Sequence, residues 1–345
     1  MTENNVEAPA ARLLPWQANA AGQLGRAWTA NRLPHALLVQ GADGVGKRAF
    51  AAWIACAVLC ENSKDAALEC CGRCASCALV KAGSHPDLQW IVPEEDKTQI
   101  SIDQVRAATE RLGKTSYRQG YKVAIIDPAH QMTLAAANGV LKTLEEPSGA
   151  SLLILVTSRP SALPATVRSR CQKITVSRPS RDEATRWLRS ETGRDVQPGL
   201  LEFAGGAPLR ALAYADGRFD ALDEQMQKSL AGLLAGRVDV TQVATEWEKE
   251  GLADRLTWLD LWLSSAARAA LAGTAEPVTF PAGNAHLPSL PRTLNISSVY
   301  NMVDRARALK AQLTRTALQR ELAVESWLIA LLQMLTPAMA PNPRS

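Results

Sequence analysis

The sequence lacks any long run of apolar residues. A membrane-spanning helix needs about 20 predominantly apolar residues in succession, and the best candidate, Leu256–Leu271, is interrupted by Asp260 and Arg268. Residues 1–12 are polar and acidic, without the apolar segment of a secretory signal peptide. We therefore expect no membrane span and no cleaved leader, and we expect a cytoplasmic protein.

The sequence also lacks a strong charge of either sign. Its 345 residues carry a formal net charge of +4. A domain that binds nucleic acid through its own surface usually has a larger basic excess, so this charge is compatible with DNA contact without establishing it. Hydrophobic residues make up 47% of the chain and charged residues 21%, which is typical of a globular protein with a sizeable core. The length suggests two or three domains.

Short apolar runs alternate with helical patterns in the first half of the chain. The predicted strands are Ala36–Gln40, Leu88–Val92, Lys122–Ile126, Leu152–Thr157 and Lys173–Val176. A capping box at Ser101 begins a helix that runs to Leu112, and another helix spans Thr133–Glu146, just before Pro147. Strands that alternate with helices predict an α/β fold whose parallel sheet is covered on both faces.

After Pro179 the pattern changes to helices alone. The shorter predicted helices are Asp182–Glu191, Pro198–Ala204 and Leu209–Ala213. The proline-rich stretch Gly273–Leu294 predicts a loop, and one long helix is predicted over Ser298–Met334. We expect an α/β domain at 1–178, a small helical domain at 179–217 and a helical C-terminal domain at 218–345.

The segment after the first predicted strand fits the phosphate-binding pattern G-x-x-x-x-G-K. It contains Gly41, Gly44, Gly46 and Lys47. Glycines let backbone N–H groups close around phosphate oxygens, and the lysine and the start of the next helix add positive potential. A purely structural turn is the alternative, but the strand before the segment and the helix after it favour a nucleotide site.

Two residues depart from a working ATPase. Arg48 occupies the position of the Ser or Thr that binds Mg²⁺ in a P-loop, and arginine cannot coordinate a cation. The third predicted strand ends in Asp127, as a metal-binding strand does, but it is followed by Pro128, which offers no side-chain base. We therefore expect weak or absent ATP hydrolysis, while the intact glycines and lysine are compatible with nucleotide binding.

Six of the seven cysteines lie between residues 56 and 77. In the cytosol, clustered cysteines favour a metal site over disulfides. We predict a structural Zn²⁺ ion with the ligands Cys60, Cys71, Cys74 and Cys77. Free thiols and an iron–sulfur cluster are the alternatives for the group as a whole.

Three nearby residues complicate the choice of metal ligands. Cys70 is adjacent to Cys71 and is an alternative to it, and His85 is an outside candidate. Cys56 lies one helical turn before Cys60 and is expected in the core. Four thiolates would leave no open coordination position, so the predicted role is structural.

Three further motifs occur in order along the chain. They are Leu33–Ala36 (Leu-Pro-His-Ala), Leu141–Pro147 (Leu-Lys-Thr-Leu-Glu-Glu-Pro) and Ser169–Cys171 (Ser-Arg-Cys). Together with the altered P-loop, they make the chain resemble the delta-prime subunits of bacterial DNA polymerase III clamp loaders, which are relatives of the AAA+ ATPases. The resemblance covers about Leu13–Leu212. It implies an AAA+ domain with a zinc module, a helical lid domain and a helical collar domain.

The resemblance implies a stator, a subunit that supports the ATPase of its neighbours. Arg170 would act as an arginine finger in a neighbouring ATP site; a surface ion pair is the alternative. Thr157 and Arg210 match nucleotide-sensing positions of a degenerate site for ATP or ADP. The implied partners are the gamma/tau and delta subunits of a hetero-pentamer and, through the complex, the sliding clamp and primed DNA.

Other features leave alternatives open. Residues 159–194 carry nine basic and three acidic residues, which suits either a DNA-facing surface or a solvated one. A motor ATPase of the same complex would need Ser or Thr at position 48 and Glu at position 128. An unrelated zinc-binding P-loop protein would not explain the Ser-Arg-Cys motif.

No acidic set typical of a polymerase or exonuclease occurs, so any polymerase activity would belong to the whole complex. The core tryptophans are expected to be Trp247, Trp258, Trp262 and Trp327.

Overall fold

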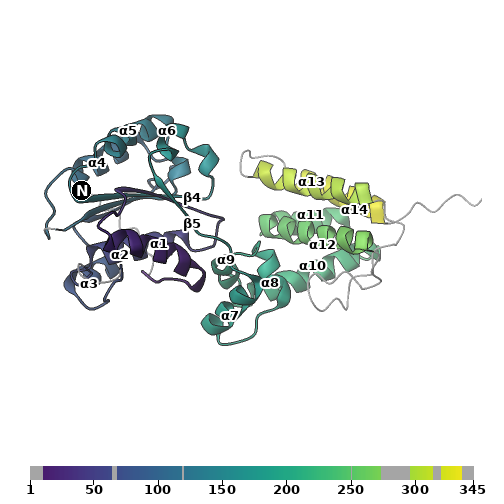
Figure 1. The fold of residues 1–345 in the computed structure, drawn as a ribbon. Coiled ribbons are helices and arrows are strands. Elements are labelled where there is room, and N and C mark those ends of the chain that lie inside the picture. The colour runs from purple at the N-terminus through teal and green to yellow at the C-terminus, as the bar shows by residue number, and fades with distance from the viewer. Residues whose placement is uncertain are drawn as a thin grey trace, which may run out of the picture. The chain divides into compact units, whose positions relative to one another are not determined.

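The structure is a computed structural model, and it describes residues 11–63, 68–118, 120–249, 251–272, 296–313 and 320–335 (Figure 1). The chain divides into two units, Met1–Glu183 and Ala184–Ser345. The first unit is built on a parallel β-sheet and the second consists of helices. No helix within the described ranges combines the length and the apolar character that a membrane crossing needs.

Five parallel strands form the sheet in the order β2-β3-β4-β1-β5. The strands are β1 (Ala36–Gln40), β2 (Leu88–Ile91), β3 (Lys122–Ile126), β4 (Ser151–Thr157) and β5 (Gln172–Thr175). All five predicted strands are thus confirmed, with ends shifted by about one residue. The central strand β1 pairs with both β4 and β5, so that Gln40 lies beside Thr157 on one side and Thr175 on the other.

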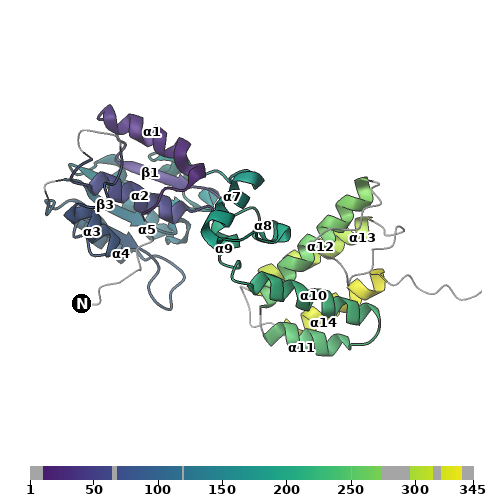
Figure 2. The same cartoon turned by 90° about the horizontal axis from the view of Figure 1, so that it is seen from below.

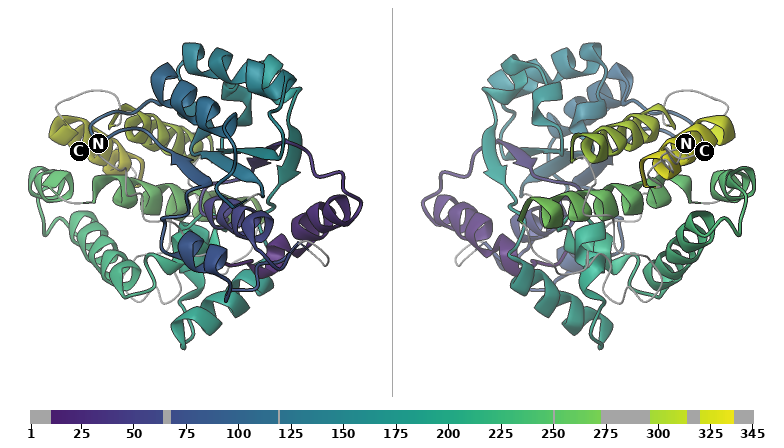
Figure 3. Two further views of the ribbon diagram at one scale, coloured as in Figure 1. Left: turned by 90° about the vertical axis from the view of Figure 1, so that its left-hand side faces the viewer. Right: turned by 90° about the vertical axis from the view of Figure 1, so that its right-hand side faces the viewer.

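Helices cover both faces of the sheet (Figures 1 and 3). One face packs against α1 (Ala18–Thr29), α2 (Lys47–Leu59) and α3 (Ala75–Lys81). The other packs against α4 (Ile102–Leu112), α5 (Leu134–Glu145) and α6 (Ala165–Arg168). Successive strand side chains alternate between these two cores: Leu37 and Val39 enter the first, and Leu38 enters the second. Burial on both faces explains why the strands are almost continuously apolar.

Side-chain caps begin two helices of the second face, α4 and α5. Ser101 Oγ accepts a hydrogen bond from the Gln104 backbone N–H at 3.3 Å, while Gln104 Oε1 accepts one from the Ser101 N–H at 3.0 Å. This is the predicted capping box, and it satisfies two donors that a helix start would otherwise leave free. Thr133 caps α5 in the same manner through the Ala136 N–H, at 3.1 Å.

Eight helices follow in the described part of the chain. They are α7 (Arg181–Thr192), α8 (Pro198–Phe203), α9 (Pro208–Leu212), α10 (Arg218–Leu234), α11 (Val240–Lys249), α12 (Leu252–Ala272), α13 (Ile296–Leu313) and α14 (Arg320–Leu335) (Figure 2). Trp247, Trp258, Trp262 and Trp327 are all buried, as predicted for core anchors. The indole N–H of Trp258 donates to Asp223 at 2.8 Å, so its polar atom is satisfied inside the core.

The prediction of one long helix over Ser298–Met334 was wrong. In a continuous helix, Met302 and Trp327 would lie about 37 Å apart along the axis, at 1.5 Å per residue. In the structure the Trp327 indole N–H donates to the Met302 carbonyl at 3.2 Å, and α13 packs against α14. Residues 314–319 contain neither Gly nor Pro, so no turn signal separates the two helices in the sequence. The loop predicted at Gly273–Leu294 lies outside the described residues.

The close approach of Gly41 to β5 yields a first test. A Cβ at this position would lie 2.4 Å from the Val176 carbonyl oxygen, which requires backbone movement. Gly41→Ala should therefore lower the free energy of unfolding by about 1–3 kcal/mol, measured by urea denaturation of the full chain. Gly25→Ala is the matched control, because a Cβ there meets no atom within 4 Å, and it should be neutral or stabilise α1 by about 0.5–1 kcal/mol. Equal stability of the two variants would contradict the packing of Gly41.

Candidate nucleotide site and metal cluster

The phosphate-loop segment, residues 41–47, joins β1 to α2. Gly44 and Gly46 have φ angles of +73° and +87°, which are left-handed conformations that favour glycine. Gly46 is the N-cap residue of α2, so the first turn of that helix begins directly at the loop. The free backbone N–H groups and positive dipole end of a helix start suit an anionic phosphate group.

Lys47 lies folded over the phosphate loop. Its side chain is 8% exposed, and its Nζ donates to the Ala42 carbonyl at 2.6 Å and lies 3.4 Å from Asp43 Oδ1. The ammonium group is therefore held above the loop rather than extended into solvent. Its partners are a neutral carbonyl and an exposed carboxylate, which a phosphate can replace.

Two residues before α1 brace the same loop from the other side. Gln17 is fully buried, and its side-chain amide donates to the Gly46 carbonyl at 2.9 Å. The Trp16 indole N–H donates to the Val45 carbonyl, also at 2.9 Å. Sequence reasoning missed this brace, because nothing in the short segment Pro15–Gln17 marks it as a partner of a loop about 30 residues away.

Arg48 forms an ion pair with the carboxylate that follows β3. Its Nε lies 3.5 Å from Asp127 Oδ2, and its guanidinium carbon lies 5.3 Å from the centre of the Trp90 ring. Burial raises the pKa of Asp127, while the positive charges of Arg48 and Lys47 act in the opposite direction. The two positions that depart from a working ATPase in the sequence are thus neighbours in space.

A Mg²⁺ ion does not fit this arrangement. Mg²⁺ requires near-octahedral oxygen ligands at about 2.1 Å, and Arg48 has no oxygen to offer. Its guanidinium instead pairs with Asp127, the carboxylate that the sequence predicted as a metal ligand. The residues of this site therefore do not suit metal-dependent chemistry.

Thr157 lies at the end of β4, beside the strand that leads into the phosphate loop. It is fully buried, its Oγ1 is 3.1 Å from His130 Nδ1, and it accepts a hydrogen bond from the Arg159 N–H at 3.1 Å. Burial lowers the pKa of His130, and the charge of Arg159 lowers it further, so both act against protonation of the imidazole. His130 was not predicted from the sequence, where a lone histidine after a strand carries little signal.

Arg170 is displayed on the surface just after α6. It is 38% exposed, its Nη1 donates to the Thr166 carbonyl at 3.0 Å, and its Nη2 lies 2.7 Å from Glu145 Oε1. Glu145 belongs to the Leu141–Pro147 motif, so two of the motifs that carried the family resemblance meet here. The next residue, Cys171, is buried, and burial raises the pKa of its thiol to about 11, which suits an inert anchor for the exposed arginine.

Arg210 belongs to the second unit. It is placed on α9 and is partly buried. The predicted role of Arg210 beside nucleotide stays a prediction.

The sulfur atoms of Cys60, Cys71, Cys74 and Cys77 all lie within 4.8 Å of one another. The Cys60–Cys74 and Cys71–Cys77 distances are 4.0 and 3.9 Å, close to the roughly 3.8 Å edge of a tetrahedron with metal–sulfur bonds of about 2.3 Å. Backbone N–H groups of three of these residues point at sulfur atoms of the set at 3.3–3.4 Å. This group can hold a metal ion.

The other candidates, Cys56, Cys70 and His85, lie outside this set of four. Hydrogen bonds from the Arg73 and Cys74 backbones lower the pKa of Cys71 to about 6, which favours the thiolate that a metal binds. A hydrogen bond with Cys70 raises the pKa of the buried Cys56 thiol, as does its burial. His85 Nδ1 accepts a hydrogen bond from the Asp87 N–H at 3.1 Å, so this ring nitrogen is engaged in the turn before β2.

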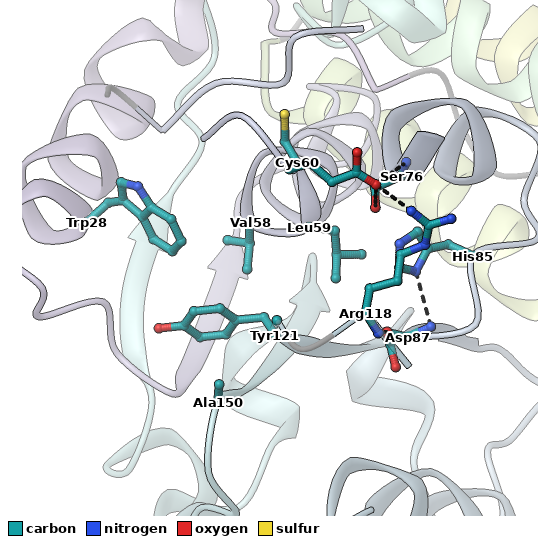
Figure 4. A pocket seen from close by; sticks show the side chains of 12 residues that line it. Trp28, Val58, Leu59, Cys60, Ser76, His85, Asp87, Arg118, Tyr121 and Ala150 are labelled. Atoms are coloured by element: carbon teal, nitrogen blue, oxygen red, sulfur yellow. Dashed lines mark hydrogen bonds and ion pairs between the residues drawn. The ribbon is translucent and has the colours of Figure 1, made fainter. Parts of the chain in front are cut away.

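A cavity of about 310 Å³ adjoins the cysteine cluster, with Cys60 in its wall (Figure 4). Its apolar side is formed by Trp28, Val58, Leu59 and Tyr121, and its polar side by Glu61, Ser76, His85, Asp87 and Arg118. Glu61 pairs with Arg118 and also accepts hydrogen bonds from the Ser76 N–H and hydroxyl, at 3.3 and 3.1 Å. These contacts tie the segment that carries the cluster to the segment before β3.

Comparison with known proteins gave matches along most of the chain. The model of the family "DNA polymerase III, delta subunit" matches residues 16–180, and that of its C-terminal region matches residues 220–333. The DNA polymerase III subunits delta′ of Pseudomonas aeruginosa and Escherichia coli are each 34% identical to this chain. The alignments cover 73% and 74% of this chain, respectively, and 76% of each relative. The subunit tau of Bacillus subtilis is 33% identical over 71% of this chain and 44% of its own length.

The choice of Cys71 over Cys70 as a metal ligand can be tested by substitution. Cys71→Ser should lose most of the bound metal, because it removes one of four ligands, whereas Cys70→Ser should retain about one ion per chain. Elemental analysis of protein purified without chelators measures the ratio, and thermal melting checks that both variants fold. Equal metal loss from both variants would contradict the choice of Cys71, and metal-free wild-type protein would contradict the site.

Proposed function

This chain belongs to the family of DNA polymerase III delta-prime subunits, and we propose that it acts as the delta-prime subunit of a bacterial clamp loader. In this role it is a stator that supports ATP hydrolysis by its neighbours. It helps to load the sliding clamp onto primed DNA during replication. The three domains in this proposal are the AAA+ domain at 1–178, the lid at 179–217 and the collar at 218–345.

One observation carries the stator role: the ion pair between Arg48 and Asp127. A motor subunit needs a metal ion and a base beside the γ-phosphate. Here the Arg48 guanidinium pairs with Asp127, the carboxylate at the end of β3. Pro128 follows Asp127 in the chain. The motor role, which the match with subunit tau keeps as a second candidate, would require catalysis without either group.

Arg170 is the proposed arginine finger. Its exposure and its place at the end of α6 support a role on a neighbouring molecule. An exposed ion pair such as Arg170–Glu145 contributes only about 0–1 kcal/mol, so Glu145 can orient the guanidinium and still release it to a γ-phosphate. An arginine finger in such a position raises the rate by about 10³–10⁵ at the site that it completes.

The proposed partners are other clamp-loader subunits. The relatives are named as subunits of DNA polymerase III, which supports assembly of this chain with subunits of the same complex. In our proposal the gamma/tau and delta subunits complete a hetero-pentamer, and the sliding clamp and primed DNA are reached through that complex. The chain itself contributes no polymerase chemistry.

Zinc is the proposed metal of the cysteine cluster. Four thiolates in a tetrahedral arrangement suit Zn²⁺, and such a site is closed to substrate. Its role would then be to fix the segment between α2 and α3. The proposed degenerate nucleotide site combines the phosphate loop and Asp127 with the sensing residues Thr157 and Arg210, and it holds ATP or ADP without hydrolysing it.

ATP turnover tests the stator role. The purified chain alone should hydrolyse ATP no faster than background, whereas its addition to a motor subunit of the same complex with primed DNA should raise the motor rate. Arg170→Ala should remove that increase. Arg170→Lys should fail to restore it, because lysine keeps the charge without the planar fork.

Arg106→Ala is the matched control, because Arg106 is an exposed arginine of the same unit on the outer side of α4. This variant should stimulate the motor like the unchanged chain. Robust turnover by the chain alone would overturn the stator role. Full stimulation by Arg170→Ala would overturn the finger.

A further inference from the structure

The guanidinium of Arg48 lies where a P-loop protein keeps its metal ion. In such proteins Mg²⁺ is bound by the residue after the P-loop lysine and by the carboxylate at the strand end. Here position 48 and Asp127 are also partners, at 3.5 Å, but the positive charge between them belongs to the side chain itself. The site therefore carries a built-in cation.

Two contacts orient this partly exposed cation. Nε faces Asp127, and the flat guanidinium lies over the Trp90 ring, 5.3 Å from its centre. Stacking on an aromatic face and pairing with a carboxylate are both favourable for arginine and together define the plane of the group. The two terminal nitrogens carry four more N–H donors, and their fork matches a pair of phosphate oxygens.

The remaining groups of the loop are suited to phosphate as well. The first turn of α2 starts at Gly46, and Lys47 lies over the loop with its Nζ on the Ala42 carbonyl. A phosphate chain placed there would meet the helix start, the ammonium group and the guanidinium, all of which are positive. Asp127 would then balance Arg48 as the strand-end carboxylate of a motor subunit balances Mg²⁺.

We propose that this phosphate loop binds a nucleoside triphosphate or diphosphate without any divalent cation, with Arg48 in the place of Mg²⁺. The inference rests on the nucleotide site in the proposed function, and it makes the bound nucleotide a structural ligand. Because no metal ion polarises the γ-phosphate and no base activates water, the nucleotide stays intact.

Calorimetric titration of ATP into the full chain tests this inference, once in excess EDTA and once in excess MgCl₂. ATP should bind in EDTA at least as tightly as in MgCl₂, where most of the ATP carries Mg²⁺ and no longer fits beside Arg48, whereas a metal-dependent site loses its affinity in EDTA. ADP should behave in the same way.

Variants of Arg48 and Asp127 separate the contributions of these two residues to ATP binding. Arg48→Thr should weaken ATP binding in EDTA by at least about tenfold, as expected for the loss of a charge-assisted hydrogen bond. Mg²⁺ should restore part of this loss, because the introduced hydroxyl and the Asp127 carboxylate then form the usual ligand pair. Asp127→Asn should also weaken ATP binding, and the loss of affinity in EDTA should equal the loss in MgCl₂. Arg106→Thr, which removes an equal charge from α4 on the opposite face of the sheet, should bind like the unchanged chain.

Three results would overturn the inference: binding that requires Mg²⁺, no ATP binding in either buffer, or unchanged binding by Arg48→Thr in EDTA. Circular dichroism of each variant ensures that lost affinity is not lost folding. None of these results bears on the stimulation of a motor subunit by Arg170, so the inference and the stator role succeed or fail separately.

Discussion

The register of the parallel sheet is the constraint on which the rest of the first unit depends. Because all five strands run in the same direction, their carboxyl ends meet at one edge. The pairing of Gln40 with Thr157 places the end of β4 beside the phosphate loop, and β3 brings Asp127 in from the next position. A slip of one residue in any strand would move the side chains of that strand to the opposite face, and the apolar residues of both cores resist such a slip.

The phosphate-loop pattern at this edge is combined with residues that do not suit hydrolysis. The loop, its glycines and its lysine remain, but the charges that would serve hydrolysis are satisfied within the chain: Arg48 by Asp127, and Lys47 by the loop itself. Arg170 stands apart on the surface, with a partner that holds it only weakly. Within the described residues, the unit thus combines charges that are paired around the loop with an exposed ion pair at Arg170.

Local signals in the sequence were sufficient for much of this fold. Apolar runs located the strands, the Ser101 capping box located α4, and the spacing of cysteines selected the four that cluster. What the sequence did not reveal depends on contacts between distant segments: Gln17 on Gly46, His130 on Thr157, and Arg48 on Asp127. The break between α13 and α14 was missed because helix ends are set there by packing, in a segment without Gly or Pro.

Helix α2 has a consequence that reaches beyond either of its ends. It begins at Lys47 in the phosphate loop and ends against Cys60 of the cysteine cluster, and almost all of its residues are buried. A buried helix of 13 residues behaves as a stiff rod about 20 Å long. The helix therefore connects the two ends mechanically, and thermodynamic reciprocity requires that any effect of a ligand at the loop on metal binding at the cluster equals the effect of the metal on that ligand. The cluster lies at the far end of the helix that begins in the phosphate loop.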